Sequence, residues 1–148
     1  MSCPLRFVGK DFDPDKFEEQ TGLTPVSISR KDERPTYNGK PYGRIMPYSI
    51  VSLTASDADF DDFKLQVEEV INYLKNNYKQ LQLAKGIAGL EYATLDFGVK
   101  FYCDKFTKRF WLPPELIVLA GELNISIELS IYNDDFFEKE DAGDSEPG

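Results

Sequence analysis

The sequence predicts an α+β fold, a two-layer sandwich in which helices pack on one face of a mostly antiparallel sheet of about five strands. Segments with an apolar residue at every second position alternate along the chain with segments of helical periodicity. The strand patterns are apolar on one side only, and the helix patterns are amphipathic, so one helical layer is enough to cover the sheet. With 148 residues, 41% of them hydrophobic, the chain can form one domain with a substantial core. We expect this single domain over residues 1–133, followed by a tail over residues 134–148.

The first third of the chain contains three strand patterns and one short helix. Asp13 and Pro14 predict the start of the helix, as its N-cap and its first residue, and Gly22 predicts its end. Asn38-Gly39 favours a tight turn in the long loop before the third strand. The strands are expected over Leu5–Val8, Val26–Arg30 and Tyr48–Thr54.

The middle of the chain contains the longest helix pattern. It follows Asp59, carries an apolar stripe from Phe60 to Leu81, and ends at Gly86. The clearest strand pattern of this region follows, with Leu95, Phe97, Val99 and Phe101 on one side.

A helix pattern turns directly into a strand pattern near the end. Pro113 and Pro114 open the helix, and Asn124 stands where a C-terminal cap belongs. The apolar stripe of this helix comprises Leu116, Ile117, Leu119, Ala120 and Leu123. In the following strand one side comprises Ile125, Ile127, Leu129 and Ile131.

The order of elements is strand, helix, strand, strand, long helix, strand, helix, strand. Its first six elements match the ferredoxin-like, split βαβ order, and a helix and a strand are added at the C-terminal end. The strand order in the sheet is left open by the sequence.

Several of these segments carry a family resemblance. They are the opening Leu5-Arg-Phe-Val-Gly-Lys-Asp-Phe-Asp-Pro-Asp15, Thr21-Gly-Leu-Thr-Pro25, and the closing stretch from Leu112 to Tyr132. With them the chain resembles the bacterial family named "domain of unknown function 4279", over roughly residues 5–133. That family has no established activity or catalytic residues, so the resemblance implies a small α+β domain, and some relatives resemble immunity proteins of bacterial toxin loci.

The composition limits the compartment and the class of partner. No segment approaches the roughly 18 apolar residues of a membrane span, and the N-terminus lacks the apolar run of a signal peptide, so we expect a cytoplasmic protein with no membrane partner. The net charge is −9, and residues 133–148 hold seven acids against one lysine. Such a tail is typical of disorder. An acidic chain is a poor match for nucleic acid and a better one for a basic protein.

The sequence favours a non-catalytic protein. It contains no histidine, which excludes the common nucleophilic relays and zinc triads, and we expect no catalytic residue, no metal and no cofactor. Asp57, Asp59, Asp61 and Glu68 have the spacing of a calcium loop, but Asp62 stands where that loop requires glycine. A capped, acidic helix start is the preferred interpretation.

Two basic clusters with interleaved aromatic residues are the best candidates for a binding surface. One lies in the long loop before the third strand, and the other surrounds the turn before the last helix. Together with the acidic helix start they give the candidate binding residues Arg44, Tyr48, Asp57, Asp59, Asp61, Asp62, Lys100, Tyr102 and Trp111.

Two hypotheses follow for the function. The first is a protein-interaction domain, monomeric or weakly homodimeric, that acts as an immunity protein and neutralises a basic toxin. The second is a small-molecule binding or catalytic domain. Its pocket for an anionic ligand is lined by Tyr48, Tyr102 and Trp111, with Lys100 or Arg44 as the polar group.

Overall fold

The computed structural model describes residues 1–133, and the acidic tail expected over residues 134–148 lies outside the described residues. The main sheet is formed by β1 (Cys3–Gly9), β2 (Ser27–Ser29), β5 (Ser49–Ser56), β6 (Tyr92–Phe101) and β7 (Ile125–Asn133). A separate hairpin consists of β3 (Thr36–Tyr37) and β4 (Lys40–Pro41). The helical elements are η1 (Pro14–Lys16), α1 (Phe17–Thr21), α2 (Phe63–Asn76), α3 (Tyr78–Lys85) and α4 (Pro114–Glu122).

The sheet has five strands in the order β2-β5-β1-β6-β7. All neighbours are antiparallel except β6 and β7, which are parallel and are joined through α4. The first four of these strands along the chain have the order of a split βαβ unit, and α4 and β7 extend it at one edge. The structure therefore confirms the predicted α+β class and adds the strand order.

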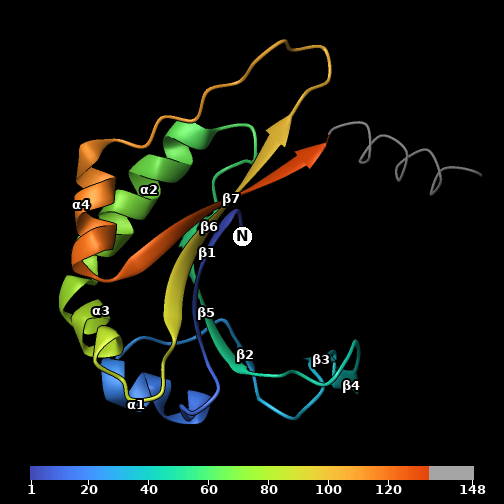
Figure 1. Cartoon of the computed structure of the whole chain (residues 1–148), viewed down its shortest axis with the longest axis vertical. Helices are drawn as coiled ribbons and strands as arrows, with labels where there is room; N and C mark the ends of the chain where they lie inside the picture. The colour runs from blue at the N-terminus through green and yellow to red at the C-terminus, as the bar shows by residue number, and fades with distance from the viewer. Residues whose placement is uncertain (134–148) are drawn as a thin grey trace, which may run out of the picture.

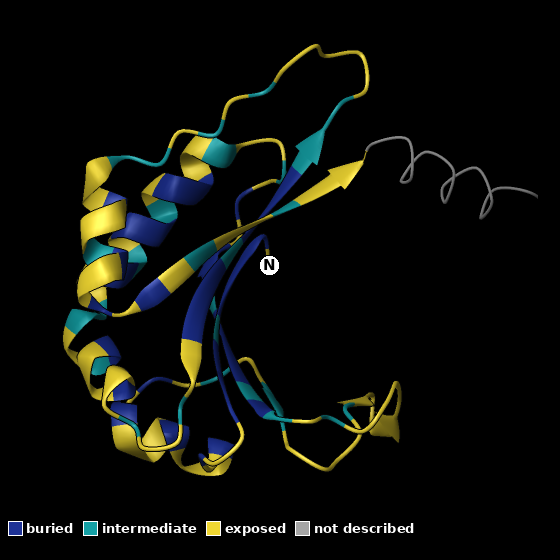
Figure 2. Ribbon diagram, viewed as in Figure 1, coloured by how far each residue is buried: buried dark blue, intermediate teal, exposed yellow. Residues whose placement is uncertain are grey.

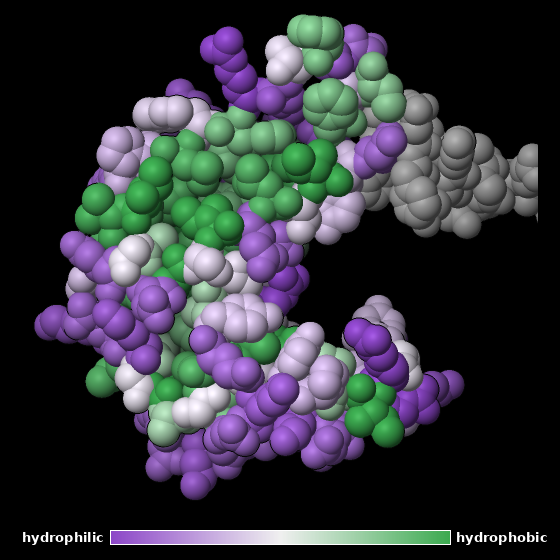
Figure 3. Space-filling model, viewed as in Figure 1, coloured by the Kyte–Doolittle hydropathy of each residue, from purple (hydrophilic) through white to green (hydrophobic). Residues whose placement is uncertain are grey.

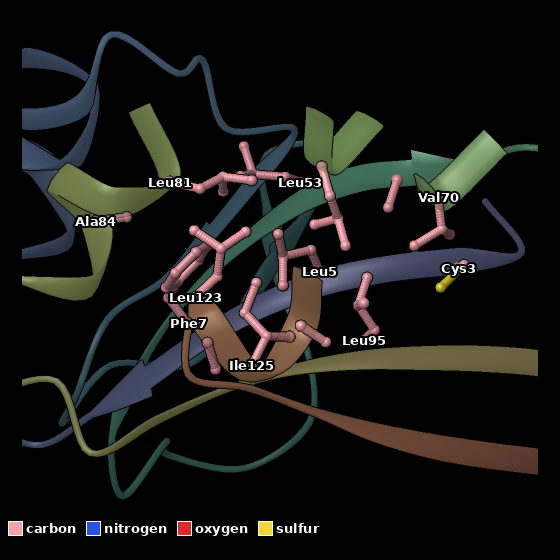
Figure 4. Close-up of a cluster of buried hydrophobic side chains, with 14 of the residues drawn as sticks. Cys3, Leu5, Phe7, Leu53, Val70, Leu81, Ala84, Leu95, Leu123 and Ile125 are labelled. Carbon is pink, nitrogen blue, oxygen red and sulfur yellow. The ribbon is translucent and has the colours of Figure 1, made fainter. Parts of the chain in front are cut away.

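The helices lie on one side of the sheet, and the β3–β4 hairpin projects on the other (Figure 1). Buried residues concentrate on the sheet strands and on the helix faces turned toward them (Figure 2). Leu5, Phe97 and Leu74 are fully buried in this layer. The close-up in Figure 4 shows side chains from β1, β5, β6 and the helices meeting in it. No helix within residues 1–133 combines the length and the apolar character needed to cross a bilayer.

The prediction of one long helix from Asp59 to Gly86 is wrong at its start and in its middle. The side chain of Asp62 accepts a hydrogen bond from the backbone N–H of Leu65 at 3.1 Å, so α2 begins at Phe63. Asn77 leaves the helical conformation and separates α2 from α3. The apolar stripe hid this break because Leu74 and Leu81 are both buried, one on each side of it.

The turns and helix ends of the shorter elements lie where the sequence predicts them. Gly22 ends α1 with φ +79°, and Asn38 and Gly39 both have positive φ in the β3–β4 turn, as a type I′ turn requires. Asn124 adopts φ +57° just after α4, the left-handed conformation of a helix end. One expectation fails, because Ile117 lies outside the buried stripe of α4 and is more than half exposed.

Candidate functional site

A groove opens between α2 and the segment that leads into α4. Its volume is about 470 Å³. We call it the Trp111 groove. It is lined by Asp61, Asp62, Phe63, Lys64, Val67, Glu68, Ile71, Arg109, Trp111 and Pro113. The groove therefore joins the acidic helix start to the second basic aromatic cluster.

The floor of the groove is apolar because it belongs to the core. Phe63, Val67 and Ile71 are spaced four residues apart and lie on one face of α2. Val67 and Ile71 are buried, and the ring of Phe63 packs edge-on against Phe97 and Phe110 at centroid distances of 5.4 and 5.1 Å. A ligand that enters the groove meets a hydrophobic surface that packs on the core.

Trp111 is the only tryptophan of the chain, and 73% of it is exposed. The segment that carries it is anchored just before the tryptophan. Phe110 packs on Phe63, and Lys108 donates a hydrogen bond from Nζ to the carbonyl oxygen of Lys100 at 2.7 Å. An exposed indole on an anchored segment is typical of a residue that a partner buries.

The acidic side of the groove is held by four hydrogen bonds. The hydroxyl of Tyr102 donates to Asp61 at 2.5 Å, and the backbone N–H of Asp61 donates to the carboxylate of Asp59 at 2.9 Å. Gln66 is fully buried and donates from Nε2 to the carbonyl oxygens of Asp59 and Gly98, at 3.0 and 2.9 Å. These bonds fix the loop before α2 onto β6.

The four predicted acids do not converge on one point. Asp61 and Asp62 line the groove, whereas Asp57 forms an ion pair with the N-terminal amine of Met1 at 3.2 Å. Asp59 turns its carboxylate toward the backbone of Asp61. Within residues 1–133 no three side chains of metal-ligating type are grouped to hold an ion. Asp62 is the N-cap of α2, so this helix begins three residues later than the start after Asp59 that the sequence predicted.

Neighbouring carboxylates on α2 also diverge, as the helical spacing predicts. Glu68 lines the groove. Glu69 instead accepts a hydrogen bond from the hydroxyl of Ser56 at 2.8 Å. The two acids therefore do not share an acid–base site.

The remaining predicted residues lie elsewhere. Arg44 is exposed between β4 and β5. Tyr48 immediately precedes Ser49, which pairs with Gly9 of β1, and Tyr92 pairs with the adjacent Val8, so Tyr48 lies near the Tyr92 end of β6. Tyr92 and Tyr102 mark opposite ends of β6, which at about 3.3 Å per residue are roughly 30 Å apart. The structure therefore does not bring Tyr48 and Tyr102 into one pocket. Lys100 lies on β6, in register with Tyr132 of β7.

The face of the sheet opposite the helices carries a polar network that the sequence did not reveal. Arg6 donates to Asp96 at 2.9 Å, and the hydroxyl of Ser130 donates to the other carboxylate oxygen at 2.5 Å. The buried hydroxyl of Thr94 lies in register with Arg6 and has no hydrogen-bond partner. Arg6 and Asp96 are charged residues within apolar strand patterns, and this could have marked them in the sequence. To predict that they pair, however, one must know that β1 lies beside β6 in the sheet. Gln66 gave no signal, because a glutamine within a helix pattern is ordinary.

The two groups with the largest upward pKa shifts are the Cys3 thiol, which lies in the core, and the Tyr73 hydroxyl, whose side chain packs against it. Burial raises the pKa of the Cys3 thiol and holds it in its neutral form. Burial also raises the pKa of Tyr73 to about 12. Both shifts follow from packing, and neither group lines the Trp111 groove.

A family model described as Domain of unknown function (DUF4279) matches residues 1–134. The chain belongs to this family. The DUF4279 description names no activity, and the comparison found no match among the curated proteins or the solved structures.

Proposed function

We propose that this DUF4279 domain is a non-catalytic protein-interaction domain that binds a basic protein through the Trp111 groove. An immunity protein that neutralises a basic toxin is the form of this function that we favour. One observation carries the proposal: a largely exposed tryptophan stands beside an apolar floor that is continuous with the core. Such an arrangement supplies the aromatic anchor and the desolvated pocket on which binding energy concentrates at protein interfaces.

Charge selects the class of partner. The chain has a net charge of −9, and the groove itself presents Asp61, Asp62 and Glu68 against Lys64 and Arg109. A negative surface speeds the capture of a positive partner, and the effect weakens as salt screens it. The expected contact is an apolar or aromatic side chain of the partner on the floor, flanked by lysine or arginine.

The test begins with a partner recovered from native cells on the tagged full chain. Calorimetric titration of the purified pair should give a complex that weakens as salt rises from about 50 to about 500 mM. A partner whose affinity is unchanged over this range, or that binds equally well when Trp111 is replaced, contradicts the proposal.

A matched pair of charge variants separates position from net charge. Glu68→Gln and Asp57→Asn each remove one negative charge, but only Glu68 lines the groove. We expect Glu68→Gln to weaken the complex about three- to fivefold and Asp57→Asn to change it less than twofold, the scale of exposed charge pairs. Equal losses would show that only total charge matters. Asp62 is avoided here because its replacement also removes the cap of α2, at a cost of about 1 kcal/mol.

The second candidate function is the binding of a small molecule. The groove volume of about 470 Å³ falls within the range of roughly 300 to 1,000 Å³ that is common for such sites. The bases that the groove offers to an anionic ligand are Lys64 and Arg109. A screened anion that raises the melting temperature, with the shift lost in Arg109→Ala, would favour this function over the first.

A further inference from the structure

The outer edge of β7 is a second surface built for pairing. β7 is the last strand in the sheet order and has nine residues, Ile125–Asn133. Within the part of the chain that the structure describes, no strand pairs with the edge of β7 that faces away from β6. Edge strands are normally protected by lysine, proline or a bulge, yet the only charged residue of β7 is Glu128.

The apolar row of β7 loses its cover along the strand. Ile125 is 6% exposed, Leu129 37% and Ile131 57%. The cause is a difference in length: α4 has nine residues and spans about 14 Å, whereas nine residues of β7 span about 30 Å. The helix that leads into β7 therefore covers its first half and leaves Leu129 and Ile131 open.

α4 itself is apolar on its outer side as well. Leu116 and Ala120 are buried against the core, while Ile117 and Val118 are more than half exposed. Figure 3 shows hydrophobic side chains gathered over α4 and the adjoining β7. Neighbouring exposed apolar side chains of this kind are typical of an interaction surface.

We propose that β7 pairs antiparallel with β7 of a second copy, which joins the two five-stranded sheets into one across a twofold axis. The sequence of β7 is complementary to itself when the axis passes through Leu129. Ile127 then opposes Ile131, and Leu129 opposes itself. In this register, residues of odd number oppose residues of odd number. The apolar side chains of both copies therefore lie on the face of the joined sheet that the helices cover.

Charge within the strand favours this register over its neighbours. With the axis at Leu129, Glu128 opposes Ser130, so no like charges face each other. An axis at Glu128 would set two glutamates directly opposite, which is destabilising, and an axis at Ser130 would pair fewer residues because it lies closer to the end of the strand. The exposed Ile117 and Val118 of α4 would extend the contact beside the seam.

Salt distinguishes this dimer from the complex of the proposed function. Two chains of net charge −9 repel each other, so higher salt should strengthen the dimer while it weakens the complex with a basic partner. The two proposals can therefore fail separately.

The first experiment is analytical ultracentrifugation of the full chain at increasing concentration. The mass should rise from 16.9 kDa toward twice that value, and Leu129→Lys should remain at 16.9 kDa. Leu83→Lys is the matched control, because Leu83 is an exposed leucine on α3, outside β7. A melting curve confirms that each variant folds. A chain that stays monomeric at its highest soluble concentration overturns the proposal, as does a dimer that Leu129→Lys leaves intact.

The second experiment tests the register. In a Cys103→Ser background, Leu129→Cys should form an intermolecular disulfide, because directly opposed residues have Cβ atoms about 4.5 to 5.5 Å apart. Ile127→Cys should not crosslink with itself but should crosslink with Ile131→Cys when the two variants are mixed. Equal crosslinking of Leu129→Cys and Ile127→Cys alone would overturn the proposed axis.

Discussion

Two segments of this chain look alike in sequence and differ in the structure. The hairpin segment, residues 30–44, and the groove segment, residues 102–111, both combine basic residues with exposed aromatic side chains. Every residue of the hairpin segment is exposed except Pro35, which is partly buried, and its two short strands pair only with each other. The groove segment is instead anchored through Phe110 to Phe63 and through it to the core.

The difference shows what makes an exposed aromatic residue a binding candidate. Tyr37 in the hairpin segment and Trp111 after Phe110 are almost equally exposed, at 72% and 73%. Only Trp111 lines a groove with an apolar floor. A partner that covers Trp111 also desolvates that floor, whereas Tyr37 stands in a segment whose residues are nearly all exposed.

The largest expected effect contrasts these two aromatic residues. Trp111→Ala should weaken binding of the basic partner by about 100-fold or more, corresponding to roughly 3 kcal/mol for a central aromatic anchor. Tyr37→Ala should change the affinity less than about threefold. Titration calorimetry with both variants measures the contrast, and both should melt close to the wild type because neither side chain is buried. Similar losses for the two would erase the distinction between the segments.

The next contrast concerns the side chains that brace each segment. Gln66→Leu removes the hydrogen bond that Gln66 donates to the buried carbonyl oxygen of Gly98, and should lower the free energy of unfolding by about 1 to 3 kcal/mol. The carbonyl oxygen of Asp59 keeps a second donor, the backbone N–H of Asp62. The removal of the unpaired Oε1 of Gln66 offsets part of this loss. Arg34 also donates to a backbone carbonyl, that of Gly43 at 3.1 Å, but it is exposed. Arg34→Leu should therefore change stability by less than about 0.5 kcal/mol.

Urea unfolding of the two variants provides this comparison. Its midpoint should fall for Gln66→Leu and stay constant for Arg34→Leu, with the slope unchanged in both. An equal shift of the urea midpoint for both variants would mean that burial does not determine how much a hydrogen bond contributes to the stability of this protein.

The smallest effect is a pH dependence confined to the base of the hairpin segment. Arg30 donates two hydrogen bonds to Asp15, at 2.9 and 2.5 Å, and this bonding lowers the pKa of Asp15 below its usual 3.8. A carboxyl group whose pKa is lower in the folded chain stabilises it above the unfolded pKa, and loses that contribution as pH falls through the folded value. The contribution is small because both side chains are exposed.

Amide NMR spectra recorded from pH 6 to pH 3 would detect this titration of Asp15. Signals near Arg30 and Asp15 should shift below about pH 4, and Asp15→Asn should remove that transition. The indole signal of Trp111 should not follow it. A transition near Arg30 that persists in Asp15→Asn would contradict the assignment.

Most of the fold followed from local patterns in the sequence. The two-residue period of β6 and β7, the prolines before α4 and the turn at Asn38-Gly39 each act over a few residues, so sequence alone determines them. The break at Asn77 escaped because the buried face continues across it. The exposure of Ile117 and Ile131 also escaped, since periodicity assigns a residue to a face but does not tell how far a neighbouring element extends over it.

The candidate site was predicted only in part for the same reason. Trp111, Asp61 and Asp62 were recognised by residue type and by their place at element ends. Gln66 and the pair Arg6 and Asp96 were missed, because their partners lie 32 and 90 residues away along the chain. Contacts of this range depend on strand order, which the sequence left open.

The single tryptophan of the chain allows the most direct test of the groove. Replacement of Trp111 by fluorotryptophan during expression would give one fluorine resonance from this chain, with no background from an unlabelled partner. On titration with the basic partner, the resonance should shift to a bound position and become protected from a soluble paramagnetic quencher. A resonance that remains at its free position and stays fully accessible in the saturated complex would show that the partner binds elsewhere, and would contradict the assignment of the Trp111 groove as the binding site.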